Sequence, residues 1–257
     1  MNNDCYYFEK IIFDKGLLDS IDRTYIIHLE GNGRLENIYK QLEEFQPTKE
    51  VYILYNKGFK KCKKELNTYN SVFDLVDAFK TIFNHAIDKN HILILEDDFF
   101  FDKKIKEQQI CDEIDQFLIK KNDNDSFVYY LGTIPYLRVP YDNNHQILLL
   151  STGTHSCIYS KKMRDETLKN KVLKDWDIYI NFNYRRYIYN IPLCYQLFPE
   201  TENSKNWGFG SNILKYIFKM NGLDKNENGY KNFYFFSKII FYIILFIILY
   251  LLKLKLK

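Results

Sequence analysis

Short apolar runs alternate with amphipathic stretches through the first 95 residues of the chain. The runs are rich in β-branched and aromatic residues, which predicts strands, whereas apolar residues three or four positions apart in the longer stretches predict helices. The expected strands lie at 24–29, 51–55 and 91–95, and the expected helices at 34–45 and 71–88. Ser71 and Asp74 have the spacing of a capping box at the start of the second helix.

Strands that alternate with helices predict an α/β fold with a mostly parallel central sheet and a ligand crevice at the carboxyl ends of its strands. Beyond residue 95 we expect shorter elements. They are strands at 127–131, 146–150, 156–159 and 193–196 and helices at about 103–121, 161–170 and 176–183. Because 257 residues are few for two large domains, we expect one domain at 22–222 after an N-terminal extension at 1–21.

The chain ends in a long apolar segment. Residues 233–252 contain one charged residue, Lys238, and as a helix they would extend about 30 Å, the thickness of the hydrocarbon core of a bilayer. We therefore predict one C-terminal transmembrane helix, joined by a polar linker at 223–232 and followed by a basic tail at 253–257. A helix lying on the membrane surface is the alternative, but residues 239–252 are apolar on every face.

Charge and cysteine content exclude several classes of protein. Residues 233–257 hold four of the 36 basic residues and no acidic one, which leaves 32 basic against 33 acidic residues, so we expect no nucleic-acid partner. The five cysteines form no CxxC pair, which argues against a zinc site or a disulfide framework and predicts reduced, buried thiols. The first twenty residues lack the features of a signal peptide, so we expect a membrane-anchored protein whose body lies in the cytosol.

Three consecutive carboxylates follow the strand at 91–95. Glu96, Asp97 and Asp98 would repel one another at the end of a buried strand unless a cation or solvent compensates their charge. Mg²⁺ or Mn²⁺, bound by one or two carboxylates and by phosphate oxygens, meets this requirement. An acidic turn that caps the next segment is the alternative.

The sequence ILILEDD at 92–98 resembles glycosyltransferase family 25, the lipooligosaccharide and collagen galactosyltransferase group, which carries an EDD variant of the DxD signature. Further segments resemble that family in the same order, and the likeness covers residues 22–206. They are YIIHLEGNGRLENIYKQL at 25–42, GTHSCIYSKKM at 153–163 and DWDIYIN at 175–181.

This resemblance implies a GT-A-like nucleotide-sugar-binding domain. It implies metal-dependent transfer of a hexose, with inversion, from a UDP-linked donor to a glycan or protein acceptor. Asp98 with Glu96 would hold Mn²⁺ or Mg²⁺. The residues expected at the nucleotide-sugar are His28, Glu30, Arg34, Glu96, Asp97 and His155. In the loop at 30–34, two glycines allow close backbone approach and Arg34 offers a cation for phosphate or ribose, although a tight turn alone would also explain the glycines.

Asp177 is the candidate for the base that takes the proton of the acceptor hydroxyl, with helix capping as its alternative role. His155 could instead be a satisfied structural residue, and Trp207 could stack on a sugar ring or pack in the core.

A second hypothesis is a catalytically silent glycosyltransferase-like module that binds a glycan or a partner at a membrane. It rests on departures from the family pattern, since His28 replaces the usual Asn and Ser71-Val72 replaces a Ser-His pair. No nucleophile elbow, zincin helix or P-loop lysine is present, so hydrolase and NTPase functions lack support.

Overall fold

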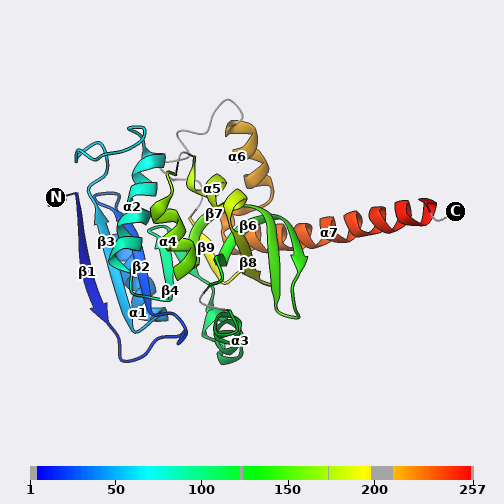
Figure 1. Ribbon diagram of the computed structural model, residues 1–257, viewed down its shortest axis with the longest axis horizontal. Helices are drawn as coiled ribbons and strands as arrows, with labels where there is room; N and C mark the ends of the chain where they lie inside the picture. The colour runs from blue at the N-terminus through cyan, green and yellow to red at the C-terminus, as the bar shows by residue number, and fades with distance from the viewer. Residues whose placement is uncertain (1–4, 122–123, 173, 198–210, 256–257) are drawn as a thin grey trace.

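A seven-stranded sheet runs through the middle of the molecule (Figure 1). The computed structural model describes residues 5–121, 124–172, 174–197 and 211–255. In the order in which they lie in the sheet, the strands are β1 (Tyr6–Ile12), β3 (Glu50–Asn56), β2 (Arg23–Leu29), β4 (His91–Glu96), β7 (His145–Ser160), β6 (Phe127–Pro140) and β8 (Arg185–Tyr189). A separate antiparallel pair consists of β5 (Phe99–Phe101) and β9 (Cys194–Gln196).

The sheet is mixed. β2 is parallel to β3 and to β4, as the alternating pattern predicts. β6 is also parallel to β8, but β1–β3, β4–β7, β6–β7 and β7–β8 are antiparallel. The prediction of a mostly parallel sheet is therefore wrong, since four of these seven pairings are antiparallel. The reason is the long β6–β7 hairpin, because strands joined by a short turn must run antiparallel, whereas parallel strands need a crossover segment.

β6 and β7 are longer than the separate short strands predicted for this part of the chain, and their pairing is interrupted by irregularities from Tyr130 onward. At Gly132, an added Cβ would lie 1.8 Å from the carbonyl oxygen of Cys194. Glycine is therefore needed here for β9 to pass close to β6, and this crossing places Gln196 beside the end of β4.

β1 forms the edge of the sheet and pairs with β3 along its whole length. An N-terminal extension was expected at 1–21, but Glu9 and Lys10 lie within this strand, and charged side chains are typical of edge strands. Leu18 and Ile21, which follow β1, are buried in the core. Residues 5–21 are therefore an integral part of the domain.

A disulfide joins Cys5, just before β1, to Cys62 in the loop after β3. The prediction of reduced thiols is wrong for this pair, because the two cysteines lie 57 residues apart and meet only through the β1–β3 pairing. Cys111, Cys157 and Cys194 are free and buried, as predicted.

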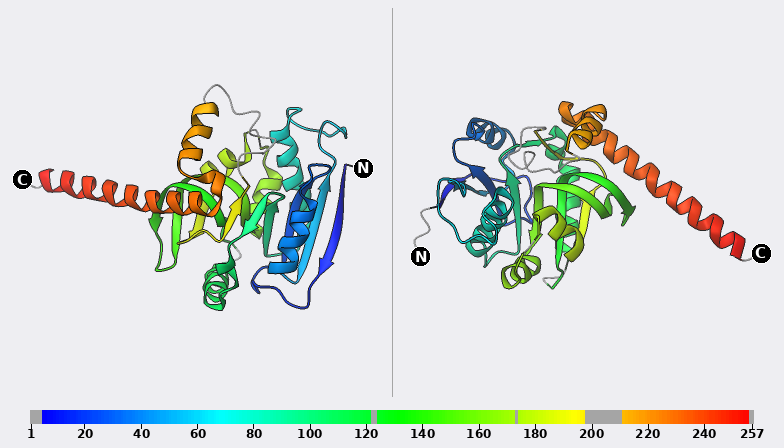
Figure 2. Two further views of the ribbon diagram at one scale, coloured as in Figure 1. Left: turned by 180° about the vertical axis from the view of Figure 1, so that it is seen from behind. Right: turned by 90° about the horizontal axis from the view of Figure 1, so that it is seen from above.

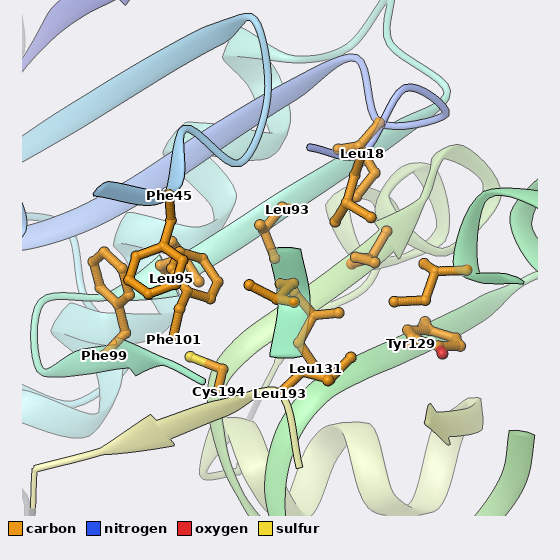
Figure 3. Close-up of a cluster of buried hydrophobic side chains, with 14 of the residues drawn as sticks. Leu18, Phe45, Leu93, Leu95, Phe99, Phe101, Tyr129, Leu131, Leu193 and Cys194 are labelled. Carbon is orange, nitrogen blue, oxygen red and sulfur yellow. The ribbon is translucent and has the colours of Figure 1, made fainter. Parts of the chain in front are cut away.

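Helices cover both faces of the sheet. They are α1 (Leu35–Phe45), α2 (Ser71–His85), a 3₁₀ turn η1 (Lys103–Lys106), α3 (Gln108–Ile119), α4 (Lys161–Lys169) and α5 (Trp176–Asn183). α1 and α3 pack on one face, and α2, α4 and α5 on the other. β4 shows the division, because Leu93 and Leu95 point into the first core (Figure 3) and Ile92 and Ile94 into the second.

α2 starts in a different way from the prediction. Asn70 is its N-cap, and the Asn70 side-chain oxygen accepts a hydrogen bond of 3.0 Å from the N–H of Phe73. Asp74 accepts a hydrogen bond from the buried ammonium of Lys64. The predicted capping box of Ser71 and Asp74 is wrong, because this ion pair occupies the carboxylate.

The chain ends in α6 (Ser211–Met220), a 3₁₀ turn η3 (Leu223–Lys225) and α7 (Glu227–Lys255). The segment 223–232 is not the expected linker, because Tyr230 and Tyr234 are buried where α7 packs against β6. The Arg138 guanidinium of β6 donates to the carbonyl oxygen of Tyr234 and, at 2.8 Å, to Oγ of Ser237. The first turns of α7 are therefore part of the domain.

The rest of α7 leaves the body and projects from it in all three views (Figures 1 and 2). Within the described residues, α7 is the one helix that is long and apolar enough to cross a membrane, with a mean hydropathy of 2.6 in its most apolar window. Length and composition alone support this statement.

Candidate active site

Four carboxylates converge beyond the carboxyl end of β4. Glu96 is the last residue of β4, and Asp97 and Asp98 lead from it into β5. Asp177 lies in the first turn of α5, and Arg34 ends the loop between β2 and α1. With His28, which lies beside Asp97, the structure brings together six of the residues that the sequence singles out.

Asp97 holds the loop after β2 in place. One carboxylate oxygen accepts a hydrogen bond of 2.7 Å from Arg34, and the other accepts from the N–H of Leu29 at 2.9 Å and from the side-chain amide of Asn32. His28 Nδ1 lies 3.4 Å from the same carboxylate. Burial would raise the pKa of Asp97, but these contacts outweigh it and lower the pKa, so Asp97 stays ionised.

The loop held by Asp97 has the open backbone expected for close approach of a ligand. Gly31 and Gly33 have φ of +80° and +78°, the left-handed region that favours glycine. The backbone N–H of Glu30 donates to the carbonyl oxygen of Asn56 at 2.9 Å, which fixes the start of the loop to β3. Within the described residues, the Glu30 side chain makes no hydrogen bond or ion pair with the carboxylate cluster, and its buried Oε1 has no partner.

Asp98 is 2% exposed and shares Arg34 with Asp97. Arg34 Nη1 lies 3.3 Å from one Asp98 oxygen, and the side-chain amide of Gln196 donates to both oxygens at 3.2 and 3.3 Å. Burial, followed by repulsion from Asp97, raises the pKa of Asp98 to about 7. At neutral pH a further positive charge close by would therefore favour the ionised form of this carboxyl group.

Glu96 and Asp177 are linked through one hydroxyl group. Thr154 Oγ1 lies 2.9 Å from an oxygen of Asp177 and 3.3 Å from an oxygen of Glu96. A hydroxyl has a single proton to donate, so it can satisfy only one of the two carboxylates at a time. Burial, with repulsion from Asp98 and then Asp177, raises the pKa of Glu96 well above its usual value.

Asp177 is oriented by two donors. The N–H of Gly153 donates to one of its oxygens at 2.8 Å and Thr154 to the other. Burial, with repulsion from Asp175, raises the pKa of Asp177 to about 6. Asp175 is the N-cap of α5, and its side chain accepts from the N–H of Asp177 at 3.0 Å. Asp175 therefore caps the helix. The side chain of Asp177 is partly exposed, so its carboxylate is available for chemistry.

His155 faces away from the carboxylates, because successive residues of β7 point to opposite sides of the sheet. The side chain is fully buried, its Nε2 lies 3.5 Å from the carbonyl oxygen of Cys194, and its ring packs edge-on against Tyr230. Burial lowers the pKa of His155 to about 4, so the ring is neutral. In this structure His155 is buried away from the carboxylates, and its Nδ1 has no hydrogen-bond partner among the described residues.

Sequence reasoning missed four groups that shape the cluster: Asn32, Gly153, Thr154 and Gln196. Thr154 lies in the segment at 153–163 that was singled out, but its orientation becomes known only with the sheet. Gln196 comes from a three-residue strand without a motif. Trp207, the further candidate for sugar contact, lies outside the described residues.

The donor set can be tested for a divalent cation. In the described ranges, no three His, Cys, Asp or Glu side chains come together as a group that could hold a metal ion. Mg²⁺ in phosphate sites, however, needs only one or two protein carboxylates, because phosphate oxygens and water complete its shell. Asp98, which is buried, and Glu96, which is half-buried, both have raised pKa values and supply the two carboxyl groups of that smaller requirement.

Comparison with known proteins gives a distant structural likeness. No protein-family model and no curated protein matches the sequence. The fold resembles A197 from STIV, with 14% identity and a TM-score of 0.39 over 69% of this chain and 85% of that chain. It also resembles a glycosyltransferase involved in the glycosylation of the major capsid of PBCV-1, with 12% identity and a TM-score of 0.33 over 63% of this chain and 71% of that chain. At these values the likeness carries no argument about activity.

Proposed function

We propose that the protein is a glycosyltransferase of the family 25 type. It moves a hexose from a nucleotide-sugar, a UDP-hexose, to a hydroxyl of a glycan or protein acceptor, with inversion. One observation carries the proposal: Glu96 and Asp177 share the Thr154 hydroxyl at the carboxyl end of a buried strand, and Asp98, two residues after Glu96, pairs with Arg34 at the end of a glycine loop. Clustered acids whose pKa values are raised by burial and by one another are typical of active sites.

The glycine loop and Arg34 form the donor side of the proposed site. Arg34 is already ion-paired with Asp97 and Asp98, so its guanidinium faces the place where a diphosphate would meet the carboxylates. Glu96 and Asp98 are the residues that would hold Mn²⁺ or Mg²⁺. The cation would supply charge neutralisation to the diphosphate leaving group. A bound cation would also keep Asp98 ionised despite its raised pKa.

Asp177 is the proposed base on the acceptor side. A base works best with a pKa near the operating pH, and a value of about 6 leaves Asp177 mostly ionised at neutral pH while it still binds a proton readily. Gly153 and Thr154 fix the orientation of the carboxylate, and each of its oxygens has a further lone pair for the acceptor hydroxyl. The proton of that hydroxyl passes to Asp177 as the hydroxyl oxygen attacks the sugar.

For the location, we propose that α7 crosses a membrane once. The Cys5–Cys62 disulfide favours an oxidising compartment for the body. The first twenty residues, which lack the features of a signal peptide, favour the cytosol instead. Protease protection in intact membrane vesicles separates the two orientations, because a body inside the vesicle is cleaved only after the membrane is opened.

The test of the function compares wild type with Asp98→Asn and with Asp112→Asn, an exposed carboxylate of α3 that contacts only Gln108 on its own helix. Calorimetry of UDP with and without Mn²⁺ measures nucleotide binding, and release of UDP from UDP-hexoses measures turnover. We expect Mn²⁺-enhanced binding and turnover in wild type and Asp112→Asn, and loss of both in Asp98→Asn. Binding without turnover on any donor would favour the silent module, and undiminished metal-enhanced binding in Asp98→Asn would refute the metal site.

A further inference from the structure

Five lysines lie in the loop that follows β3. This lysine loop, residues 57–64, reads KGFKKCKK and contains no acidic residue. Lys64 is buried, and its ammonium pairs with Asp74. Of the other four lysines three are exposed, and none of the four pairs with an acidic side chain in the part of the chain that the structure describes. The lysine loop therefore carries positive charge that the body does not compensate.

The lysine loop packs against the glycine loop that follows β2. Gly58 has φ of +75°, and a Cβ added to it would lie 2.9 Å from Cδ1 of Leu29, the last residue of β2. The backbone N–H groups of Lys61 and Cys62 donate to the carbonyl oxygen of Gly58 at 3.1 and 3.0 Å, which closes a turn. A Cβ added at Gly31 would lie 3.5 Å from Nζ of Lys61. The turn therefore places this ammonium against the glycine loop.

Two anchors hold Lys61 in this position. The disulfide joins Cys62, the next residue along the chain, to Cys5 at the start of β1. Two residues further on, the buried ammonium of Lys64 donates at 2.6 Å to the side-chain oxygen of Asn56, the last residue of β3. Because the segment around Lys61 is tied to two strands of the sheet, its backbone has little freedom to move away from the glycine loop.

The glycine loop thus lies between two cations of different status. Arg34, at its far end, is already paired with Asp97 and Asp98. Lys61, beside Gly31, has no such partner among the described residues. Three residues of extended chain cover at most about 11 Å, so a single nucleoside diphosphate lying along the loop can meet both cations. A glycine without a Cβ lets the phosphate approach the backbone, and the phosphate supplies the negative charge that Lys61 lacks.

We propose that Lys61 binds a phosphate group of the donor nucleotide across the glycine loop, and that the Cys5–Cys62 disulfide holds it there. The inference rests on the proposed function, since it takes the nucleotide-sugar as the ligand. Lys61 then contacts the donor, and the disulfide acts as a positioning element. A dithiol that reduces the disulfide to two thiols, and is itself oxidised to a disulfide, would release the turn and weaken donor binding.

The test measures binding of UDP and of uridine to the full chain in detergent micelles, by calorimetry with Mn²⁺. Lys61→Gln removes the charge and keeps most of the side-chain length. Lys60→Gln is the matched control, because Lys60 is an exposed neighbour whose ammonium lies 5.7 Å from the centroid of the Phe59 ring. We expect about tenfold weaker UDP binding in Lys61→Gln, the same uridine binding as in wild type, and wild-type affinities in Lys60→Gln.

Three results would overturn the proposal while the proposed function stands. One is the same UDP affinity in Lys61→Gln as in wild type. Another is an equal loss in Lys60→Gln, because the lysine loop would then act only as a diffuse positive surface. The third is an equal loss for uridine, which would assign Lys61 to the nucleoside. If wild type itself binds no UDP, the proposed function fails, and this inference fails with it.

The role of the disulfide has its own readout. Replacing both Cys5 and Cys62 by serine should weaken UDP binding several-fold when Lys61 is present and leave it unchanged in Lys61→Gln, because the disulfide acts on binding through Lys61 alone. Circular dichroism identifies the temperatures at which all variants are folded, and binding is measured there. An equal loss with and without Lys61 would overturn the positioning role, since a general loss of structure weakens both alike.

Discussion

The hydroxyl of Thr154 lowers the proton affinity of the proposed base, and Thr154→Val tests this. Valine keeps the shape of the side chain and removes one of the two hydrogen bonds that Asp177 accepts. A hydrogen bond to a charged group contributes about 1.5 kcal/mol, close to one pKa unit, to the ionised form. The pKa of Asp177 should therefore rise from about 6 to a value roughly one unit higher.

The sign of the effect on the rate follows from the role of the base, which must be unprotonated to accept the hydroxyl proton. At about pH 6.5 the ionised fraction of Asp177 should fall from about three quarters to about one quarter, a loss of roughly threefold in kcat. At about pH 8 both forms are nearly fully ionised, so the rates should agree. The acidic limb of the pH profile thus moves to higher pH while its plateau stays.

The assay measures the release of UDP over this pH range at saturating donor and Mn²⁺. At saturation the protonation of Asp98 no longer limits binding of the cation, so the acidic limb of the profile reports the titration of Asp177. Thr152→Val is the matched control, because the Thr152 hydroxyl pairs with Tyr136 and not with a carboxylate. An unshifted limb in a folded Thr154→Val protein, or an equal shift in the control, would refute the reasoning.

Further variants test the remaining parts of the structure. Asp177→Asn should lower transfer by roughly 10² to 10⁴ while nucleotide affinity and melting temperature stay nearly unchanged; near-normal kinetics would eliminate Asp177 as the base. Metal-dependent nucleotide binding should strengthen as pH rises through about 7, because Asp98 must lose a proton to hold a cation, and a flat calorimetric profile would contradict this. A chain that ends at residue 232 should be less stable by about 3 kcal/mol than one that ends at residue 240, since Arg138 loses its partners on α7; urea unfolding of the two decides. Replacing both Cys5 and Cys62 by serine should lower the free energy of unfolding by about 4 kcal/mol, and equal stability with and without reductant in the wild type would argue against a role for the disulfide.

The parallel part of the fold could be predicted because its signals are local. The run HILIL is apolar at every position but the first, and β4 is buried between two helical layers over that run. The carboxylates that follow it had to lie at the carboxyl edge of the sheet, where Arg34 arrives from the neighbouring strand. Most of the proposed site is therefore visible in the sequence, since it is built from the ends of adjacent parallel strands.

The rest depends on contacts between distant residues. Gln196 reaches Asp98 across 98 positions, and the Cys5–Cys62 pair exists only once an edge strand has formed. Thr154 faces the carboxylates and its neighbour His155 does not. The register of the strand decides this, because a shift of one residue would exchange the two faces of the sheet. No local pattern contains this information.

The unbroken course of α7 has a consequence for how the protein meets its acceptor. Tyr230 and Tyr234 lie inside the body, and the same helix continues to Lys255 without a loop. A body on a flexible tether sweeps a volume above the membrane, whereas a body at the end of a continuous helix keeps one height and one tilt and is free only to diffuse sideways and to spin about the helix axis. Acceptor hydroxyls would then be selected by their distance from the bilayer as well as by their chemistry. Since a helix rises about 1.5 Å per residue, four residues inserted just beyond the buried turns would lift the carboxylate cluster by about 6 Å and move that selected distance with it.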